Sequence, residues 1–100
     1  MKRLRVLDLS IQFHRECQNL RIKAYLKNQL VRATSSVALN ISEGNARFSG
    51  KDRRRFFQIA YASLKEAEIA LELAGITTHS LFCLSDHIGG SLYKLIQRCS

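Results

Sequence analysis

The sequence predicts an all-α fold, an antiparallel up-down four-helix bundle in a single domain spanning residues 1–100. The chain contains no proline, the residue that most strongly interrupts helices. Its apolar residues recur at intervals of three and four instead of alternating, which is the helical period. No repeat, low-complexity tract or linker divides the chain. These observations together favour long helices joined by short connections.

The first two helices are expected over residues 3–21 and 25–47, with a connection near 21–25. The apolar stripe expected on the first is Leu4, Leu7, Ile11, Cys17 and Leu20. The stripe expected on the second is Leu26, Leu30, Ala33, Val37 and Ile41. The second helix also contains Asn40, Ser42 and Gly44, which disfavour helix, so we expect them to serve packing or hydrogen bonding.

The third helix is predicted from Gly50 to about Gly75, and the fourth over residues 80–98. Ser49 is a candidate N-cap with Asp52 three residues later, and Gly75 is a candidate C′ glycine. The small-residue seam expected on the third helix is Phe56, Ala60, Ser63, Ala67, Ala70 and Ala74, beside Phe57, Leu64 and Leu71. The fourth helix carries Leu81, Leu84, Ile88, Leu92, Leu95 and Ile96. Gly89-Gly90 in its middle predicts a weak point or a close backbone approach.

Positive charge is concentrated in the first half of the chain. The formal net charge is +8, and 13 of the 16 lysines and arginines lie in residues 1–55. Such asymmetry favours one basic surface and makes nucleic acid the leading class of partner. An anionic membrane surface is a less supported alternative, and no apolar run reaches the ~18 residues of a membrane span.

The clearest functional signal is a basic corner between the second and third predicted helices. Its members are Arg47, Lys51, Arg53, Arg54 and Arg55. Three consecutive arginines on a helix fan over about 200°, so they could grip phosphates on two sides of a groove. Cations near a helix N-terminus also oppose the macrodipole. Cations at a position that the helix dipole disfavours indicate a functional use. We therefore favour phosphate binding over the alternative that these residues are simply solvated at the start of a helix.

A second basic group lies on the first helix and the start of the second. It consists of Lys2, Arg3, Arg5, Arg15, Arg21, Lys23 and Lys27. In a bundle these residues could share one face, which a ring of copies would turn into a positive belt. The alternative is that they serve solubility alone.

Candidate catalytic and metal sites are weak, and we expect neither an enzyme nor a cofactor. His79, Cys83 and His87 have the i, i+4, i+8 spacing of zinc ligands, but no fourth ligand stands nearby. Glu43 and Arg47 are spaced for a structural ion pair. His14 and Cys17 share a helix face, which is too little for a nucleophile. The tyrosines favour core positions, and no aromatic residue is expected to interleave the arginines as in single-strand binders.

The cysteines indicate a reducing compartment. Cys17, Cys83 and Cys99 form an odd set without CxxC spacing. The basic and then apolar N-terminus is interrupted by Asp8, Gln12 and His14 and lacks a small-residue cleavage site. We therefore expect no secretory signal and a cytoplasmic location.

Three motifs stand in the middle of the chain, residues 29–74: Q-L-x-R-A from Gln29, S-x-A-x-N-I-x-E-G-x-x-R from Ser36, and F-x-x-x-A-x-x-S-L-x-E within residues 56–66. Through these motifs the chain resembles the four-helix-bundle family of bacterial 23S rRNA intervening-sequence proteins, which includes the accessory variability proteins of diversity-generating retroelements. The resemblance implies a homopentameric, barrel-like ring with a basic surface that binds nucleic acid. In the retroelement members it implies a partner reverse transcriptase and its structured RNA.

The leading hypothesis is a non-enzymatic, oligomeric accessory protein that binds RNA or an RNA–DNA hybrid and works with a reverse transcriptase. Binding mainly through phosphates should be salt-sensitive and poorly sequence-selective. The alternative is a ribosomal-RNA-intervening-sequence-encoded bundle that acts mainly as a protein-interaction scaffold.

Overall fold

The fold is all-α. The computed structural model describes residues 2–99 and contains four helices: α1 (Arg5–Gln18), α2 (Ala24–Ala46), α3 (Gly50–Leu73) and α4 (His79–Arg98). No strand occurs within these residues, and none of their helices has the length and apolar content to cross a bilayer. The all-α four-helix prediction is confirmed.

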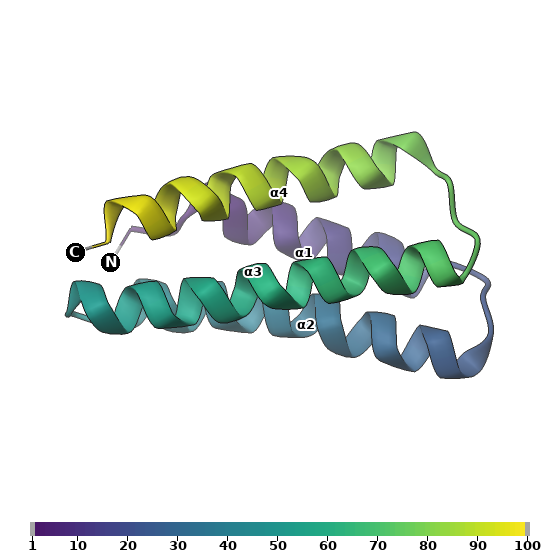
Figure 1. Ribbon diagram of the computed structural model, residues 1–100, viewed down its shortest axis with the longest axis horizontal. Helices are drawn as coiled ribbons and strands as arrows, with labels where there is room; N and C mark the ends of the chain where they lie inside the picture. Colours follow the sequence, from purple (N-terminus) through teal and green to yellow (C-terminus); the bar gives the residue numbers. More distant parts are fainter. Residues whose placement is uncertain (1, 100) are drawn as a thin grey trace.

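The helices lie side by side along an axis of 40 Å, with a cross-section of 22 × 19 Å. α1 packs against α2 and α4, and α3 packs against the same two helices, so each helix has two neighbours. Figure 1 shows the α2–α3 turn at the same end as both termini, with the other two connections at the opposite end. This placement gathers residues from three separate parts of the sequence at one end: the N-terminal segment, the α2–α3 turn and the end of α4.

The core follows the predicted stripes on α2 and α3. The five predicted α2 residues are buried, as are Phe57, Leu64 and Leu71 on α3. Within the small-residue seam of α3, the positions from Ala60 to Ala70 are buried, which brings α2 and α4 close to it. The core is therefore densest between α2 and α3, the two helices in most extensive contact.

The predicted apolar face of α1 is wrong by one position. Its buried residues are Val6, Ser10, Phe13 and Cys17. Of the expected stripe only Cys17 is buried, while Leu4, Leu7, Ile11 and Leu20 are half-buried beside it. Phe13 explains the difference, because its ring is the largest apolar group on α1 and is completely buried. The helix also ends earlier than predicted, at Gln18.

Two connections have the predicted local chemistry. The Ser49 side chain accepts a hydrogen bond from the backbone N–H of Asp52 at 3.1 Å, so Ser49 caps α3 as predicted. Gly75 has a φ of +76°. The N–H groups of Gly75 and Ile76 donate to Glu72 and Leu71, the pattern of a Schellman motif.

Polar side chains join the helices in pairs. Ser36 and Ser63 hydroxyls lie 2.8 Å apart across α2 and α3, and the Asn40 amide donates to the Ser36 carbonyl at 2.8 Å. Asn40 thus has the hydrogen-bonding role expected of it. The Ser85 hydroxyl donates to Glu68 across α3 and α4 at 2.6 Å. These contacts satisfy polar groups within the packed interfaces.

The glycines on α2 and α4 differ in what surrounds them. A Cβ at Gly44 would lie 2.7 Å from Cε1 of Phe57, so the glycine allows α2 to approach this buried ring. A Cβ at Gly89 would lie 3.4 Å from Leu64, and one at Gly90 would meet nothing within 4 Å. α4 continues unbroken through both, so the predicted weak point is not a break in the helix.

Candidate nucleic-acid interface

The termini and the α2–α3 turn lie at one end of the bundle (Figure 1). The residues at this end are strongly basic. We call it the positive end. Its cationic residues are Lys2, Arg3, Arg5, Arg47, Lys51, Arg53, Arg54, Arg55, Lys94 and Arg98. The carboxylates of the same end are Asp8, Glu43 and Asp52. This end therefore carries a clear excess of positive charge.

Arg53 is used within the protein. Its Nη1 donates to the backbone oxygens of Asn45 at 3.2 Å and Arg47 at 3.5 Å, and its guanidinium lies 5.5 Å from the centre of the Phe57 ring. Carbonyls at the end of a helix lack partners within that helix. The Arg53 side chain extends from α3 and donates hydrogen bonds to such carbonyls at the end of α2. These bonds stabilise the α2–α3 turn.

Arg47 and Arg55 converge on one aromatic ring. Their guanidinium carbons lie 4.7 and 5.3 Å from the centre of Phe56, and Arg47 also pairs with Glu43 at 3.3 Å. The predicted Glu43–Arg47 ion pair is thus confirmed. Contacts between a cation and an aromatic ring near the protein surface are worth roughly 0.5–1 kcal/mol. They restrain both arginines while leaving the side chains largely exposed to solvent.

Lys51 and Arg54 are exposed on the first turns of α3. Neither side chain makes a hydrogen bond or ion pair with another residue of the described segment 2–99. With Arg55 they form the part of the basic corner whose cationic groups are available to a ligand. We call Lys51, Arg54 and Arg55 the open cations.

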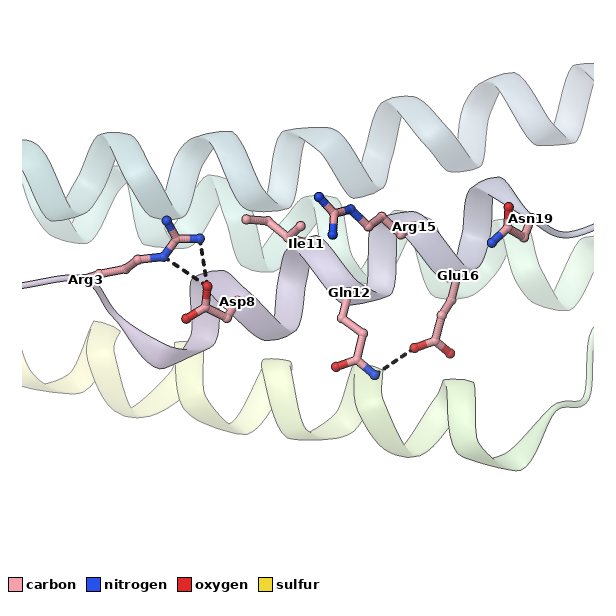
Figure 2. A pocket seen from close by; sticks show the side chains of 7 residues that line it. All are labelled: Arg3, Asp8, Ile11, Gln12, Arg15, Glu16 and Asn19. Carbon is pink, nitrogen blue, oxygen red and sulfur yellow. Dashed lines mark hydrogen bonds and ion pairs between the residues drawn. The ribbon is translucent and has the colours of Figure 1, made fainter.

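The first residues of the chain join this end. The Asn45 amide donates to the Lys2 carbonyl at 2.8 Å, which ties the N-terminal segment to the end of α2. Arg5 lines a surface hollow together with Lys94 and Arg98 of α4. Arg3 is less available, because it pairs with Asp8 at 2.7 Å (Figure 2).

Sequence reasoning missed three residues here. Lys94 and Arg98 lie in the half of the chain without excess charge, and the fold returns them to the positive end. Phe48 stands in the turn beside Arg47 and is 99% exposed, so the expectation that no aromatic residue lies among the arginines was wrong. The antiparallel pattern could have revealed the two cations, since it places the end of α4 beside the α2–α3 turn.

The family model for the 23S rRNA-intervening sequence protein matches residues 2–99. The chain belongs to this family. The match covers all four helices, beyond the middle segment in which the sequence motifs lie. No curated protein matches the chain. The positive end is therefore built within the 23S rRNA-intervening sequence domain itself.

In this member of the family, the second predicted basic group is divided. Lys2, Arg3 and Arg5 lie at the positive end, whereas Arg21, Lys23 and Lys27 lie around the α1–α2 connection at the opposite end (Figure 1). Lys27 donates to the Leu20 carbonyl at 2.6 Å and so fastens that connection. The group does not form a single cluster.

A hollow along α1 contains Arg15 but has no excess charge (Figure 2). It is lined by Arg3, Asp8, Ile11, Gln12, Arg15, Glu16 and Asn19. Two carboxylates balance its two arginines, and Gln12 donates to Glu16 at 2.9 Å. This balance makes the hollow a poorer phosphate site than the positive end.

The cysteine and histidine residues do not assemble a site. Within residues 2–99, no three metal-ligating side chains are placed to hold one ion; the His79 Nε2 atom lies 3.2 Å from Cys83 Sγ.

Cys17 is fully buried, and this burial, with Glu16 nearby, raises its pKa to about 12. Its thiol stays protonated at neutral pH, so it is a poor nucleophile. His14 instead contacts the Thr34 hydroxyl at 2.7 Å, joining α1 to α2.

Proposed function

We propose that this member of the 23S rRNA-intervening sequence family is a non-enzymatic nucleic-acid-binding protein whose positive end contacts phosphates of RNA or an RNA–DNA hybrid. The observation that carries the proposal is the convergence of cations from the N-terminal segment, the α2–α3 turn and the end of α4. Lysine and arginine at such density attract polyanions over distances comparable to the Debye length, about 10 Å at 0.1 M salt.

A salt titration tests this proposal. We expect nuclease-treated protein to bind single-stranded RNA with a log–log slope of affinity on salt steeper than about −3, because each neutralised phosphate contributes about −0.7. Fluorescence anisotropy of a labelled oligonucleotide, titrated with protein at several salt concentrations, would measure the affinities and so the slope. Absence of binding at low salt, or affinity that does not change with salt, would refute phosphate recognition.

Self-association is the second part of the proposal, as a homopentameric, barrel-like ring of antiparallel up-down bundles. An exposed apolar stripe on α3 supports it: Ile59, Ile69 and Leu73 lie on one side of the helix and are exposed. The end of this stripe borders a groove lined by Leu26, Gln29, Glu66, Ile69, Ala70 and Leu73. A small domain with such a surface gains stability by covering it.

A single charge on this stripe should disrupt the assembly. Ile69→Glu should lower the mass measured by light scattering toward that of one chain, 11.4 kDa, because a carboxylate would be buried at the interface. Tyr93→Glu is the matched control, since Tyr93 on α4 is also 56% exposed. Wild-type protein that is a monomer at micromolar concentration would contradict the ring.

The same apolar stripe also favours the alternative function of a protein-interaction scaffold. In the retroelement version of the proposal, the partner is a reverse transcriptase and the protein acts in the cytoplasm. A protein partner that stays bound after nuclease treatment and in about 1 M salt, where charge attraction is screened to about 3 Å, would support a scaffold role. A partner released by nuclease would support binding through nucleic acid.

A further inference from the structure

The aromatic side chain of Phe48 is exposed to solvent and lies among charged residues. It lies in the three-residue connection between Ala46 and Gly50, and 99% of its surface is exposed. Phenylalanine has no polar atom that would favour this position, and an exposed aromatic ring among cations is the combination that binds bases and phosphates together. The ring therefore calls for a ligand with an apolar face.

The surroundings of Phe48 indicate the charge of that ligand. The ring borders a hollow between the start of α3 and the end of α4, lined also by Gly50, Arg53, Phe57, Leu95, Arg98 and Cys99. The charged side chains of this lining are both arginines. On its other side Phe48 borders a hollow in which Arg47 stands with Glu43 and Asp52. The first hollow is thus the one that suits an anion.

A nucleotide combines the two required properties, because its base has a flat apolar face and its phosphate is anionic. Bases stack on aromatic side chains whatever their sequence. In a duplex, however, both faces of each base are already covered by neighbouring base pairs. An exposed phenyl ring beside cations therefore adds affinity only for a base that is free of a helical stack.

We propose that Phe48 stacks on an unpaired base and that Arg98 binds an adjacent phosphate, so that the positive end selects single-stranded over duplex nucleic acid. This inference rests on the proposed nucleic-acid binding. It adds the class of ligand: a single strand, or the loop of a structured RNA.

The absence of tryptophan from the chain provides a direct test. In the F48W variant, an unstructured oligo(U) strand should quench the indole fluorescence by stacking, while a duplex at equal phosphate concentration should leave it nearly unchanged. The Y25W variant is the control, because Tyr25 is 65% exposed and lies at the opposite end of the bundle. Its emission should not respond to either ligand.

Affinity measurements on Phe48→Leu complete the test. This change keeps an apolar side chain but removes the aromatic face, so single-strand affinity should fall by roughly tenfold to a hundredfold. Duplex affinity should be unchanged. Arg98→Gln should weaken single-strand binding and make its salt dependence less steep.

The outcomes separate this inference from the proposed function. Binding of the wild type to neither ligand would defeat both. Salt-dependent binding with no quenching in F48W and no loss in Phe48→Leu would overturn the stacking inference and leave phosphate binding standing. Emission of F48W that is blue-shifted and depends on protein concentration without nucleic acid would also overturn it, because a second copy of the chain would then cover the position.

Discussion

Gly44→Ala should lower the free energy of unfolding by about 1–3 kcal/mol, the usual range for overpacking a well-packed core. Alanine favours an isolated helix over glycine by up to ~1 kcal/mol, so helix propensity alone predicts the opposite sign. Packing should prevail because the new methyl carbon would lie 2.7 and 2.9 Å from two carbons of Phe57. That ring is fully buried and cannot move without displacing its neighbours. Chemical denaturation followed by circular dichroism would measure the change.

Gly90→Ala is the matched control for this substitution. Gly90 is also inside a helix, but a Cβ there meets nothing within 4 Å, so this variant should be stabilised by up to ~1 kcal/mol. Both variants should be compared at one protein concentration, because assembly would make stability depend on it. A double-mutant cycle with Phe57→Leu should show favourable coupling, since the smaller side chain relieves the clash. A stabilised Gly44→Ala variant would contradict the close packing.

Replacing the open cations should cause the largest loss of nucleic-acid affinity. For Lys51→Gln, Arg54→Gln and Arg55→Gln together, we expect at least a tenfold loss at ~50 mM salt. The salt slope should become less steep by about 2, at about 0.7 for each lost phosphate contact. Arg53 is deliberately retained, because its guanidinium binds the carbonyls at the end of α2. If Arg53 were also replaced, a lower affinity could result from a disturbed turn instead of from a lost phosphate contact.

A triple substitution with the same change in charge is the control. Arg15→Gln, Arg21→Gln and Lys23→Gln remove three exposed cations away from the positive end. This variant should keep most of the wild-type affinity, and anisotropy titrations at several salt concentrations would compare the two. Equal losses in both variants would mean that binding depends on net charge and that the open cations are not a site.

The helical architecture could be predicted because its signals are local. Ser49, Gly75 and the α2 stripe each act within a few residues, and the structure has them as expected. The face of α1 could not be fixed in this way. Two adjacent apolar stripes were available on this short helix, and the choice between them depends on how Phe13 fits against the neighbouring helices.

The basic corner was recognisable from composition, but the roles of its members depend on three-dimensional contacts. Consecutive arginines look equivalent in sequence, yet Arg53 turns toward the end of α2 while Arg54 remains in solvent. The contribution of Arg98 depends on the return of α4 to this end. The exposure of Phe48 depends on the conformation of the three-residue turn between α2 and α3.

The contact of Arg53 with the end of α2 changes how sequence variation in relatives should be interpreted. In a relative with the same turn, selection for folding would act on position 53 whether or not that relative binds nucleic acid, because a donor there pairs with the carbonyls at the end of α2. Invariance at this position is therefore no evidence for a shared ligand. Positions 51 and 54 carry no such structural demand, so retention of positive charge there across homologues would record selection for binding.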